Sequence, residues 1–285
     1  MYIIIISQNN YIYMNIKIIF YVVIFVIASF ILYGLLNLKC LKYFENLNSS
    51  FKICMFLTSK HNEEAENCIK TIENIGHKKN IYVTALDESA NKYMNNLNVH
   101  VINEHVNVDD HANQGTKEFF KIVIQKPKAI YKLLTKYNEI ILYTDTDIVF
   151  LRDIKPAIDA FEKSDYDIMF QDDNSNYCSG FMLFKPNDKI KKYLKDIITS
   201  MESDFSKIDP NRKKGYADQL YFNKLYNKHN INVGVLNKLD FPNGTRYFDN
   251  NNTYEEYIPV IVHNNCIKGL QNKIERFKKY GLWFI

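Results

Sequence analysis

The sequence has little that points to a zinc site or to nucleic acid. None of its five cysteines belongs to a CxxC pair, so a zinc site is not indicated. The 36 basic and 32 acidic residues leave a formal net charge of +4, with no long basic block or basic–aromatic stripe typical of nucleic-acid binding. No internal repeat is present. The 285 residues, 47% of them apolar, suffice for one packed domain or two fused halves.

The longest apolar run lies near the N-terminus. Residues 18–38 contain no charge, and 21 residues are enough to cross a bilayer as a helix. No small-residue cleavage site is obvious, which favours an uncleaved anchor over a signal peptide. Lys17 precedes the run and Lys39 and Lys42 follow it, so the positive-inside rule gives no firm orientation. A buried core helix is the alternative.

Asparagine-linked glycosylation sequons begin at Asn48, Asn243 and Asn251. They suit a domain that lies in the lumen of the secretory pathway. A chain as rich in asparagine as this one also produces such triplets by chance, so the sequons alone do not establish glycosylation.

Apolar periodicity predicts alternating strands and helices after residue 50. We expect strands at 51–58, 81–86, 99–102, 139–143, 148–151, 166–170, 177–185 and 258–263. We expect helices at 62–75, 116–137 with an interruption at Pro127, 156–163, 189–201, 217–227 and 267–280. Residues 230–257 are expected to be mostly loop with short strand pieces. This rhythm favours an α/β fold with a parallel sheet that has helices on its faces.

Two carboxylates follow the most apolar of these strands. Residues i and i+2 of an extended chain point to one side, so Asp145 and Asp147 can face the same point. Like charges that close repel unless a cation lies between them. Hard divalent ions often bridge carboxylates to substrate phosphates. The pattern predicts a metal–diphosphate site at the end of a buried strand; a turn or helix-capping pair is the alternative.

Four motifs occur in order along the chain. They are YTDTDIVFLRD at 143–153, CSGFMLFKP at 178–186, ADQLYFN at 217–223 and HNNCIKG at 263–269, the last followed by Lys273 and GLW at 281–283. Together they resemble the nucleotide-diphospho-sugar transferase family of GT-A-type glycosyltransferases, which includes plant xylosyl- and arabinosyltransferases and amoebal galactosyltransferases. The resemblance covers residues 51–285, weakly at the start and well from Lys126 onward.

The resemblance implies a GT-A-type, Rossmann-like mixed sheet flanked by helices and preceded by a transmembrane helix. The expected parts are a tail at 1–17, a signal anchor at 18–38, a stem at 39–50 and a catalytic domain at 51–285. The expected protein is a type II, single-pass membrane protein with a lumenal catalytic domain in the Golgi or endoplasmic reticulum. It would move a sugar from a nucleoside diphosphate, UDP by expectation, to a hydroxyl of a glycan or glycoprotein, with retention.

The family pattern also assigns a metal site. Asp147 would bind Mn²⁺ or Mg²⁺ directly, Asp145 would reach the metal and the ribose, and His263 would be the third protein ligand. Imidazole together with carboxylates suits Mn²⁺. A satisfied core histidine is the alternative interpretation of His263.

The diphosphate would be bound close to this metal. Gly269 would let the backbone approach it, because glycine has no side chain to block the approach. Lys273, or else Lys268, would neutralise the phosphates, and Asn265 belongs to the same donor-binding set. The alternative for the lysines is a solvated helix face.

A further lysine precedes the central strand. Lys126 lies where the family has a lysine that contacts the donor, in competition with Lys128 and Lys121. A surface role is the open alternative for Lys126.

The sugar would be bound by residues of two later motifs. Asp173, or else Asp172, would hydrogen-bond the donor sugar, while Ser179 and Gly180 would line its pocket. Cys178 stands where many relatives have asparagine, which leaves an amide contact there in doubt. A simple bulge is the alternative role for Gly180.

Asp218 and Gln219 begin a helix and would contact the sugar. A helix-dipole charge is the alternative role for Asp218. Because Gln219 is a poor nucleophile, we favour attack on the face from which the leaving group departs, with a phosphate oxygen accepting the proton. Asp218 or Asp173 as a covalent nucleophile is the weaker alternative.

Two rival functions are compatible with parts of the pattern. Asp145 and Asp147 also fit the first motif of haloacid dehalogenase-like phosphatases, and Asp172 and Asp173 mimic the later acidic pair. The spacing between the two pairs is too short for the strand–helix units that such a fold requires. A catalytically inactive, membrane-anchored protein that binds sugar nucleotides or glycans is the non-enzymatic alternative.

Overall fold

The computed structural model describes residues 50–106, 116–174, 176–207, 217–249 and 251–285. Residues Ser50 to Ile285 form one compact unit. The candidate anchor at 18–38 and the tail and stem around it lie outside the described residues, apart from Ser50. Within the part of the chain that is described, no helix is both long and apolar enough to span a bilayer.

The core of the unit is a seven-stranded mixed sheet with the order β3-β2-β1-β4-β7-β6-β8. β1, β2, β3 and β4 run parallel to one another, and β7 is antiparallel to both of its neighbours. The strands are β1 (Phe51–Leu57), β2 (Ile81–Ala85), β3 (His100–Asn103), β4 (Ile140–Thr144), β6 (Ile168–Asp173), β7 (Asn176–Phe184) and β8 (Val233–Val235). The mixed α/β sheet that the resemblance implied is confirmed, whereas the parallel sheet predicted from the strand–helix rhythm is wrong, because β7 is antiparallel to its neighbours.

Both faces of the central strands are buried, which explains their unbroken apolar sequences. In β4, Ile140 and Leu142 pack into the core on one face, while Ile141 and Tyr143 pack into the core on the other. Strand β1 alternates in the same way. The carboxylates of Asp145 and Asp147 therefore follow a strand, β4, that is buried on both faces.

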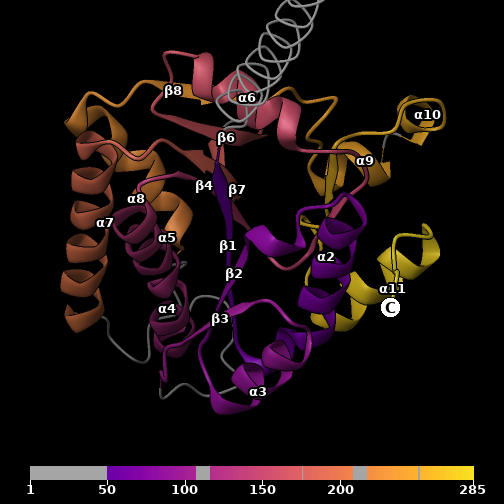
Figure 1. The fold of residues 1–285 in the computed structure, drawn as a ribbon, viewed down its shortest axis with the longest axis horizontal. Helices are drawn as coiled ribbons and strands as arrows, with labels where there is room; N and C mark the ends of the chain where they lie inside the picture. The colour runs from indigo at the N-terminus through magenta and orange to yellow at the C-terminus, as the bar shows by residue number, and fades with distance from the viewer. Residues whose placement is uncertain (1–49, 107–115, 175, 208–216, 250) are drawn as a thin grey trace, which may run out of the picture. The chain divides into compact units, whose positions relative to one another are not determined.

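Helices cover the two faces of this sheet (Figure 1). Helices α4, α5, α7 and α8 lie on one side, and α2, α3 and α11 lie on the other (Figure 1). The α-helices are α2 (Asn62–Asn74), α3 (Glu88–Asn96), α4 (Lys117–Val123), α5 (Gln125–Tyr137), α6 (Lys155–Lys163), α7 (Asp188–Lys207), α8 (Asp218–Leu225), α9 (Gly244–Asp249), α10 (Asn251–Tyr254) and α11 (Leu270–Lys279). The 3₁₀ turns are η1 (Ser59–His61), η2 (Lys78–Asn80) and η3 (Tyr226–His229).

A second sheet of two strands joins distant parts of the sequence. Strand β5 (Ile148–Phe150) pairs antiparallel with β9 (Ile261–His263), and Ile148 lies opposite His263 in the register. The strand expected at 148–151 is present as β5. It belongs to this second sheet and not to the main one, and it brings β9 next to the end of β4.

Two local expectations can be compared directly with the structure. The helical segment before β4 breaks at Ile124, and Pro127 lies in the first turn of α5, where a missing N–H costs no hydrogen bond. The segment 230–257 is less loop-like than expected, because it contains α9 and α10. Both helices are shorter than two turns, too short for apolar periodicity to reveal them.

The sequon at Asn243 is not available for glycosylation in the folded chain. The Asn243 side chain is fully buried, and its Oδ1 accepts a hydrogen bond from the Arg246 N–H at the start of α9. Asn48 and the side chain of Asn251 lie outside the described residues. A helix-capping role therefore replaces the glycan-acceptor interpretation at Asn243.

Candidate functional site

The two carboxylates lie just beyond the C-terminal end of β4. The Asp145 N–H donates to the Gly180 carbonyl over 2.8 Å, which extends the β4–β7 ladder to the first carboxylate. The order of the parallel strands reverses between β1 and β4, because β2 lies on one side of β1 and β4 on the other. The crevice outside the carboxyl ends of strands at such a reversal is the usual ligand site of open α/β sheets.

His263 reaches the same point through the second sheet. Asp147 directly precedes β5 and His263 is the last residue of β9, so their pairing places the two side by side. The Asn264 N–H continues the ladder by donating to the Asp147 carbonyl over 2.8 Å. The Nε2 atom of His263 is 3.4 Å from Asp147 Oδ1. His263 is buried, as the core interpretation expected, and it also lies beside the acids, as the ligand interpretation requires.

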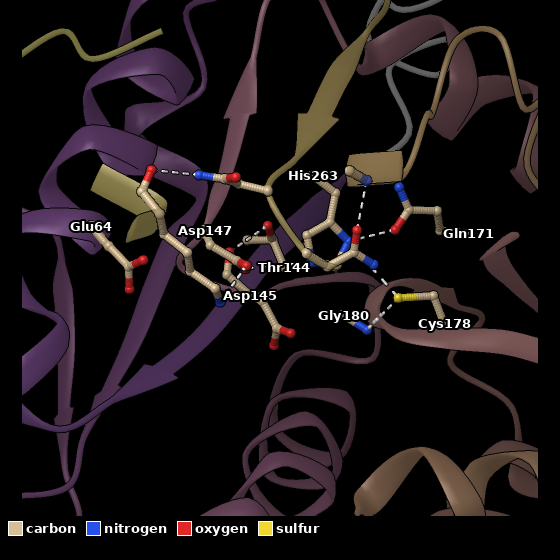
Figure 2. Close-up of polar contacts among 12 residues, drawn as sticks. Glu64, Thr144, Asp145, Asp147, Gln171, Cys178, Gly180 and His263 are labelled. Atoms are coloured by element: carbon tan, nitrogen blue, oxygen red, sulfur yellow. Dashed lines mark hydrogen bonds and ion pairs between the residues drawn. The ribbon is translucent and has the colours of Figure 1, made fainter. Parts of the chain in front are cut away.

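Asp145, Asp147 and His263 together form a candidate metal centre (Figure 2). One ligand atom from each of the three lies within 4.8 Å of the others. Two carboxylate oxygens and an imidazole nitrogen at this spacing fit a divalent ion such as Mn²⁺. Asp147 and His263 are buried while Asp145 is partly exposed, which leaves one side open to a ligand.

Lys273 supplies positive charge to the same carboxylate. It extends from α11, and its Nζ lies 2.7 Å from Asp147 Oδ2. Lys268 is exposed, and among the described residues it does not line either cavity at the site. Of the two candidate phosphate-binding lysines, the fold directs Lys273 to the metal centre.

The charges at this centre shift the pKa values of Asp147 and His263. Burial raises the pKa of Asp147, but the neighbouring Lys273 and His263 outweigh that effect and hold the pKa well below its usual range. Burial lowers the pKa of His263, and the Asp147 carboxylate outweighs it, so the net shift is upward. The residues thus form a compact set of opposite charges in a site that excludes most of the solvent.

Lys126 connects the metal centre to helix α8. Its ammonium group is 3.1 Å from Asp145 Oδ1 and 2.8 Å from Asp218 Oδ2, and it donates to the Ser179 carbonyl. Only 4% of the residue is exposed. Lys128 instead pairs with Glu202. The surface interpretation of Lys126 is therefore wrong.

Gln219 joins two of the residues that the motifs predicted, Ser179 and Asp173. Its Oε1 accepts from the Ser179 N–H over 3.2 Å, and its Nε2 donates to Asp173 Oδ2 over 3.1 Å. Asp172 points elsewhere, because it pairs with Arg246 at 2.7 Å and Lys238 at 3.3 Å. The structure thus brings Asp173, not Asp172, to the predicted sugar-binding residues.

Gly180 lies directly against the metal centre. A Cβ atom at this position would lie 2.5 Å from His263 Cε1 and 2.7 Å from Asp145 Oδ2. Those distances are shorter than any van der Waals contact. Gly180 is therefore required by close approach, and not merely by a strand bulge.

Of the described residues in the last motif, Asn265 lines a cavity at the site, whereas Gly269 does not. Asn265 lines the cavity beside α8, and its Oδ1 accepts from the Gly244 N–H over 2.6 Å. Gly269 precedes α11 with a φ of 91°, a conformation that glycine adopts readily. Among the described lining residues Gly269 is absent, so its visible role is to start the helix that carries Lys273.

Two cavities meet at Asp145, Asp147 and Lys273. The cavity beside β1, of about 260 Å³, is lined by Phe56, Leu57, Thr58, Lys60, His61, Glu64, Phe119, Ile122, Val123, Lys126, Thr146 and Asp218 in addition. We call it the β1 cavity. The other, of about 490 Å³, is lined additionally by Phe119, Lys126, Asn176, Cys178, Ser179, Gly180, Ala217, Asp218, Gln219, Leu220, Asn223, His263 and Asn265. We call it the α8 cavity.

Two residues of the site carry no signal that we recognised in the sequence. Glu64 looks like an ordinary acidic residue in the first turn of α2, yet it is 1% exposed and lines the β1 cavity. Gln171 looks like one polar residue among several in β6, yet it is fully buried against His263. Only the packing reveals either role.

Comparisons with a family model and with known proteins agree on one family. A model of the nucleotide-diphospho-sugar transferase family matches residues 76–277. A UDP-galactose:fucoside alpha-3-galactosyltransferase of Dictyostelium discoideum is 33% identical over 190 residues, which cover 60% of this chain and 29% of that protein. A UDP-D-xylose:L-fucose alpha-1,3-D-xylosyltransferase 1 of Arabidopsis thaliana is 29% identical over 192 residues, covering 60% of this chain and 52% of that protein.

Solved structures of low sequence identity share the fold. Mouse xyloside xylosyltransferase 1 in its apo form matches with a TM-score of 0.50 and 13% identity, covering 76% of this chain and 98% of that one. An active-site mutant of LgtC matches with a TM-score of 0.50 and 14% identity, covering 81% and 95%. The phosphatase interpretation finds no support in these comparisons. With its GT-A-like mixed sheet, the chain belongs to the nucleotide-diphospho-sugar transferase family.

Proposed function

We propose that this chain is a metal-dependent glycosyltransferase that uses a UDP-sugar donor. The observation that carries the proposal is that Asp145 and Asp147 line two adjoining cavities together with Lys273, and that His263 meets the two acids there. Oxygen and imidazole ligands would hold Mn²⁺, or Mg²⁺ in its place. When bound, this ion would neutralise negative charge on the donor diphosphate.

The two cavities suggest how the donor lies. The diphosphate would occupy the junction at Asp147 and Lys273, the nucleoside the β1 cavity, and the sugar the α8 cavity. Glu64 supports the nucleoside assignment. Its Oε2 accepts from His61, whereas no described residue hydrogen-bonds its Oε1. A buried carboxylate oxygen of this kind would accept a hydrogen bond from uracil N3–H or from a ribose hydroxyl.

The relatives suggest the sugars involved. Their names give UDP-galactose or UDP-D-xylose as donor and a fucoside or L-fucose as acceptor. We propose the same classes of donor and acceptor for this chain. The chain spans about 29% and 52% of those two proteins, so the proposal extends only as far as the donor site and the hydroxyl acceptor that faces it.

Negative charge grows on the leaving diphosphate as the sugar takes on oxocarbenium character. Lys273 would stabilise that charge, because its ammonium group is already at the junction of the cavities. Lys126 would orient the Asp145 and Asp218 side chains, because its ammonium group lies against both carboxylates. Phe119 and Leu220 would offer apolar surface to the sugar, because both line the α8 cavity.

We propose retention through attack on the leaving-group face. A covalent route would need a carboxylate free to attack the sugar. Asp218 is paired with Lys126, Asp173 accepts from Gln219, and the Gln219 amide is itself a poor nucleophile. The departing phosphate oxygen would instead accept the proton of the acceptor hydroxyl. Trapping of a glycosylated enzyme would refute this route.

The N-terminal segment is proposed as a membrane anchor. Residues 18–38 are long and uncharged enough to span a bilayer, which would make the chain a type II protein with a lumenal catalytic domain in the Golgi or endoplasmic reticulum. Carbonate extraction and protease protection of the full chain in microsomes would test it. Release by carbonate, or digestion of the domain in sealed vesicles, would contradict it.

The first prediction concerns the metal ligand Asp147. We expect the wild type to hydrolyse one or a few UDP-sugars when Mn²⁺ is present. In Asp147→Asn the rate of this hydrolysis is expected to fall by at least about a hundredfold, since the ion that would stabilise the charge on the leaving diphosphate loses a ligand. A screen of UDP-sugars with Mn²⁺ and with a chelator measures both effects.

Asp153→Asn is the matched control for this screen. Asp153 is an exposed carboxylate that pairs with His77 away from both cavities, and its replacement is expected to leave turnover unchanged. Undiminished turnover in Asp147→Asn, or after chelation, would overturn the metal-dependent mechanism. UDP binding without turnover on any donor would instead support an inactive sugar-nucleotide-binding protein.

A further inference from the structure

Gln171 lies behind the metal centre, on the opposite side of the His263 ring from the carboxylates (Figure 2). It belongs to β6 and is fully buried. The register between β6 and β7 shifts between Phe170 and Gln171, which marks an irregularity at this position. Such irregularities re-aim side chains, and here the side chain contacts His263.

The hydrogen bonds around Gln171 fix the orientation of its amide. The Nε2 atom donates to the Pro242 carbonyl over 2.9 Å and to the Phe241 carbonyl over 3.2 Å. Backbone carbonyls only accept, so the nitrogen of the amide must face them. The Oε1 atom then faces His263 and lies 2.6 Å from its Nδ1. Because an amide oxygen only accepts, Nδ1 must carry a hydrogen.

A hydrogen on Nδ1 also determines whether Nε2, the other ring nitrogen, has a free lone pair. Nε2 points to the carboxylates, 3.4 Å from Asp147 Oδ1. When a neutral imidazole has its hydrogen on Nδ1, its lone pair is on Nε2. Cys178 lies 3.8 Å from Nδ1 and could favour the opposite arrangement by donating its S–H, but the Gln171 contact is much shorter. The amide therefore determines which nitrogen is offered to a cation.

We propose that Gln171 is a positioning residue that keeps the hydrogen of His263 on Nδ1 and so presents Nε2 to the divalent ion. The proposal rests on the proposed metal-dependent function. A partner that fixes the tautomer and orientation of a metal-binding histidine commonly contributes about 10- to 100-fold to metal affinity. Gln171 touches neither cavity among the described lining residues, so it acts only through His263.

Binding of Mn²⁺ alone tests the proposal without any turnover. Gln171→Met keeps the length of the side chain but removes the acceptor, and its Mn²⁺ affinity, measured by titration calorimetry or by the electron paramagnetic resonance of free Mn²⁺, is expected to fall about 10- to 100-fold. Gln171→Glu is expected to restore an affinity close to that of the wild type. A neutral, protonated glutamate still presents a carbonyl oxygen to Nδ1 and an O–H to the Pro242 carbonyl.

A stability control separates positioning from packing. Tyr193→Phe removes a buried hydroxyl that donates to the Phe222 carbonyl, away from both cavities, and is expected to bind Mn²⁺ as the wild type does. Equal Mn²⁺ affinity in wild type and Gln171→Met would overturn the proposal. Equal weakening in Gln171→Met and Gln171→Glu would overturn it too, because it would show that packing and not the acceptor matters.

The tautomer can also be observed directly in the wild type, which needs no variant to fold. With Zn²⁺ as a diamagnetic probe, ¹H–¹⁵N correlation spectra are expected to show the metal-shifted imidazole bound through Nε2 with a hydrogen on Nδ1. Binding through Nδ1 would overturn the assignment. A wild type that binds neither Mn²⁺ nor Zn²⁺ and hydrolyses no UDP-sugar would refute the proposed function itself, whereas normal wild-type binding with an unaffected Gln171→Met would refute only the role of Gln171.

Discussion

At the scale of single residues, Gly180 leaves the space in which the metal ligands meet. Its Cα lies so close to His263 and Asp145 that any added carbon would collide with both. Glycine at a close approach like this one has a steric reason that no propensity scale contains. The positions of the metal ligands thus depend on the absence of a Cβ atom at Gly180.

Gly180→Ala is therefore expected to displace the imidazole, the carboxylate or both. We expect Mn²⁺ affinity to fall by about tenfold or more, since ligand geometry must stay within a few tenths of an ångström. Calorimetric titration with Mn²⁺ measures the effect, and circular dichroism checks that the fold is retained. Wild-type affinity in a folded Gly180→Ala protein would show that neighbouring side chains yield without cost.

His263 also makes the site sensitive to pH. The Asp147 carboxylate raises the pKa of His263 despite the opposing effect of burial, so protons compete with a cation for this nitrogen around neutral pH. We expect Mn²⁺ affinity to rise by about tenfold per pH unit where one proton is released on binding. The same raised pKa means that the contribution of His263 to metal-free stability is fully present below its unfolded pKa and is lost as the pH rises through the folded value. Titrations between about pH 6 and pH 8 test the first expectation, and an affinity that does not change would contradict it.

At the scale of elements, the site depends on α11 docking in the right place. This helix carries Lys273 to the metal centre and packs Phe277 into a small cluster with Val149, Phe248 and Val262. The segment after α11 is tied to α2 by Asn67, whose Nδ2 donates to the Leu282 carbonyl and whose Oδ1 accepts from the Phe284 N–H. The buried amide of Asn67 thus joins α2, which contributes Glu64, to the segment that directly follows α11.

Asn67→Ala is expected to lower the free energy of unfolding by about 1–3 kcal/mol, because two backbone groups lose a buried partner. Chemical denaturation of the two proteins measures this difference. Asn95→Ala serves as the control, since Asn95 is exposed and bonds only within its own helix, and it is expected to change stability by less than about 0.5 kcal/mol. Equal effects of the two substitutions would contradict the linking role of Asn67.

At the scale of the whole molecule, the site is made by segments from both ends of the folded unit. The β1 side supplies Thr58 and Glu64, the middle of the chain supplies the two carboxylates, and α11 supplies Lys273. A ligand that bridges these segments can bind only when the whole sheet is formed. Binding should therefore stabilise the entire unit and not one part of it.

We expect UDP with Mn²⁺ to raise the melting temperature. At a hundredfold excess over the dissociation constant the stabilisation is about 2.7 kcal/mol. For a domain of this size that corresponds to a shift on the order of 5–10 °C. Scanning calorimetry with UDP and Mn²⁺, compared with UDP and a chelator, measures the shift. A similar shift in Asp147→Asn, or an equal one without Mn²⁺, would contradict joint binding at this centre.

Local apolar periodicity was enough to predict the long helices, most of the strands and the positions of the two carboxylates. A fully apolar strand has to be buried on both faces, so its end is a fixed place for Asp145 and Asp147. The resemblance of the ordered motifs to the family also pointed to His263, and to Lys273 or Lys268, as partners.

Which polar residues meet depends on the packing of elements that lie far apart in the sequence. Local patterns do not distinguish Lys126 from Lys128, or Asp173 from Asp172, because both members of each pair are close together in the sequence. Their separation comes from burial and from partners on other elements, such as Asp218 for Lys126 and Arg246 for Asp172. The orientation of His263 by Gln171 likewise arises from the pairing of β5 with β9 and the packing of β6 behind it, which no short stretch of sequence encodes.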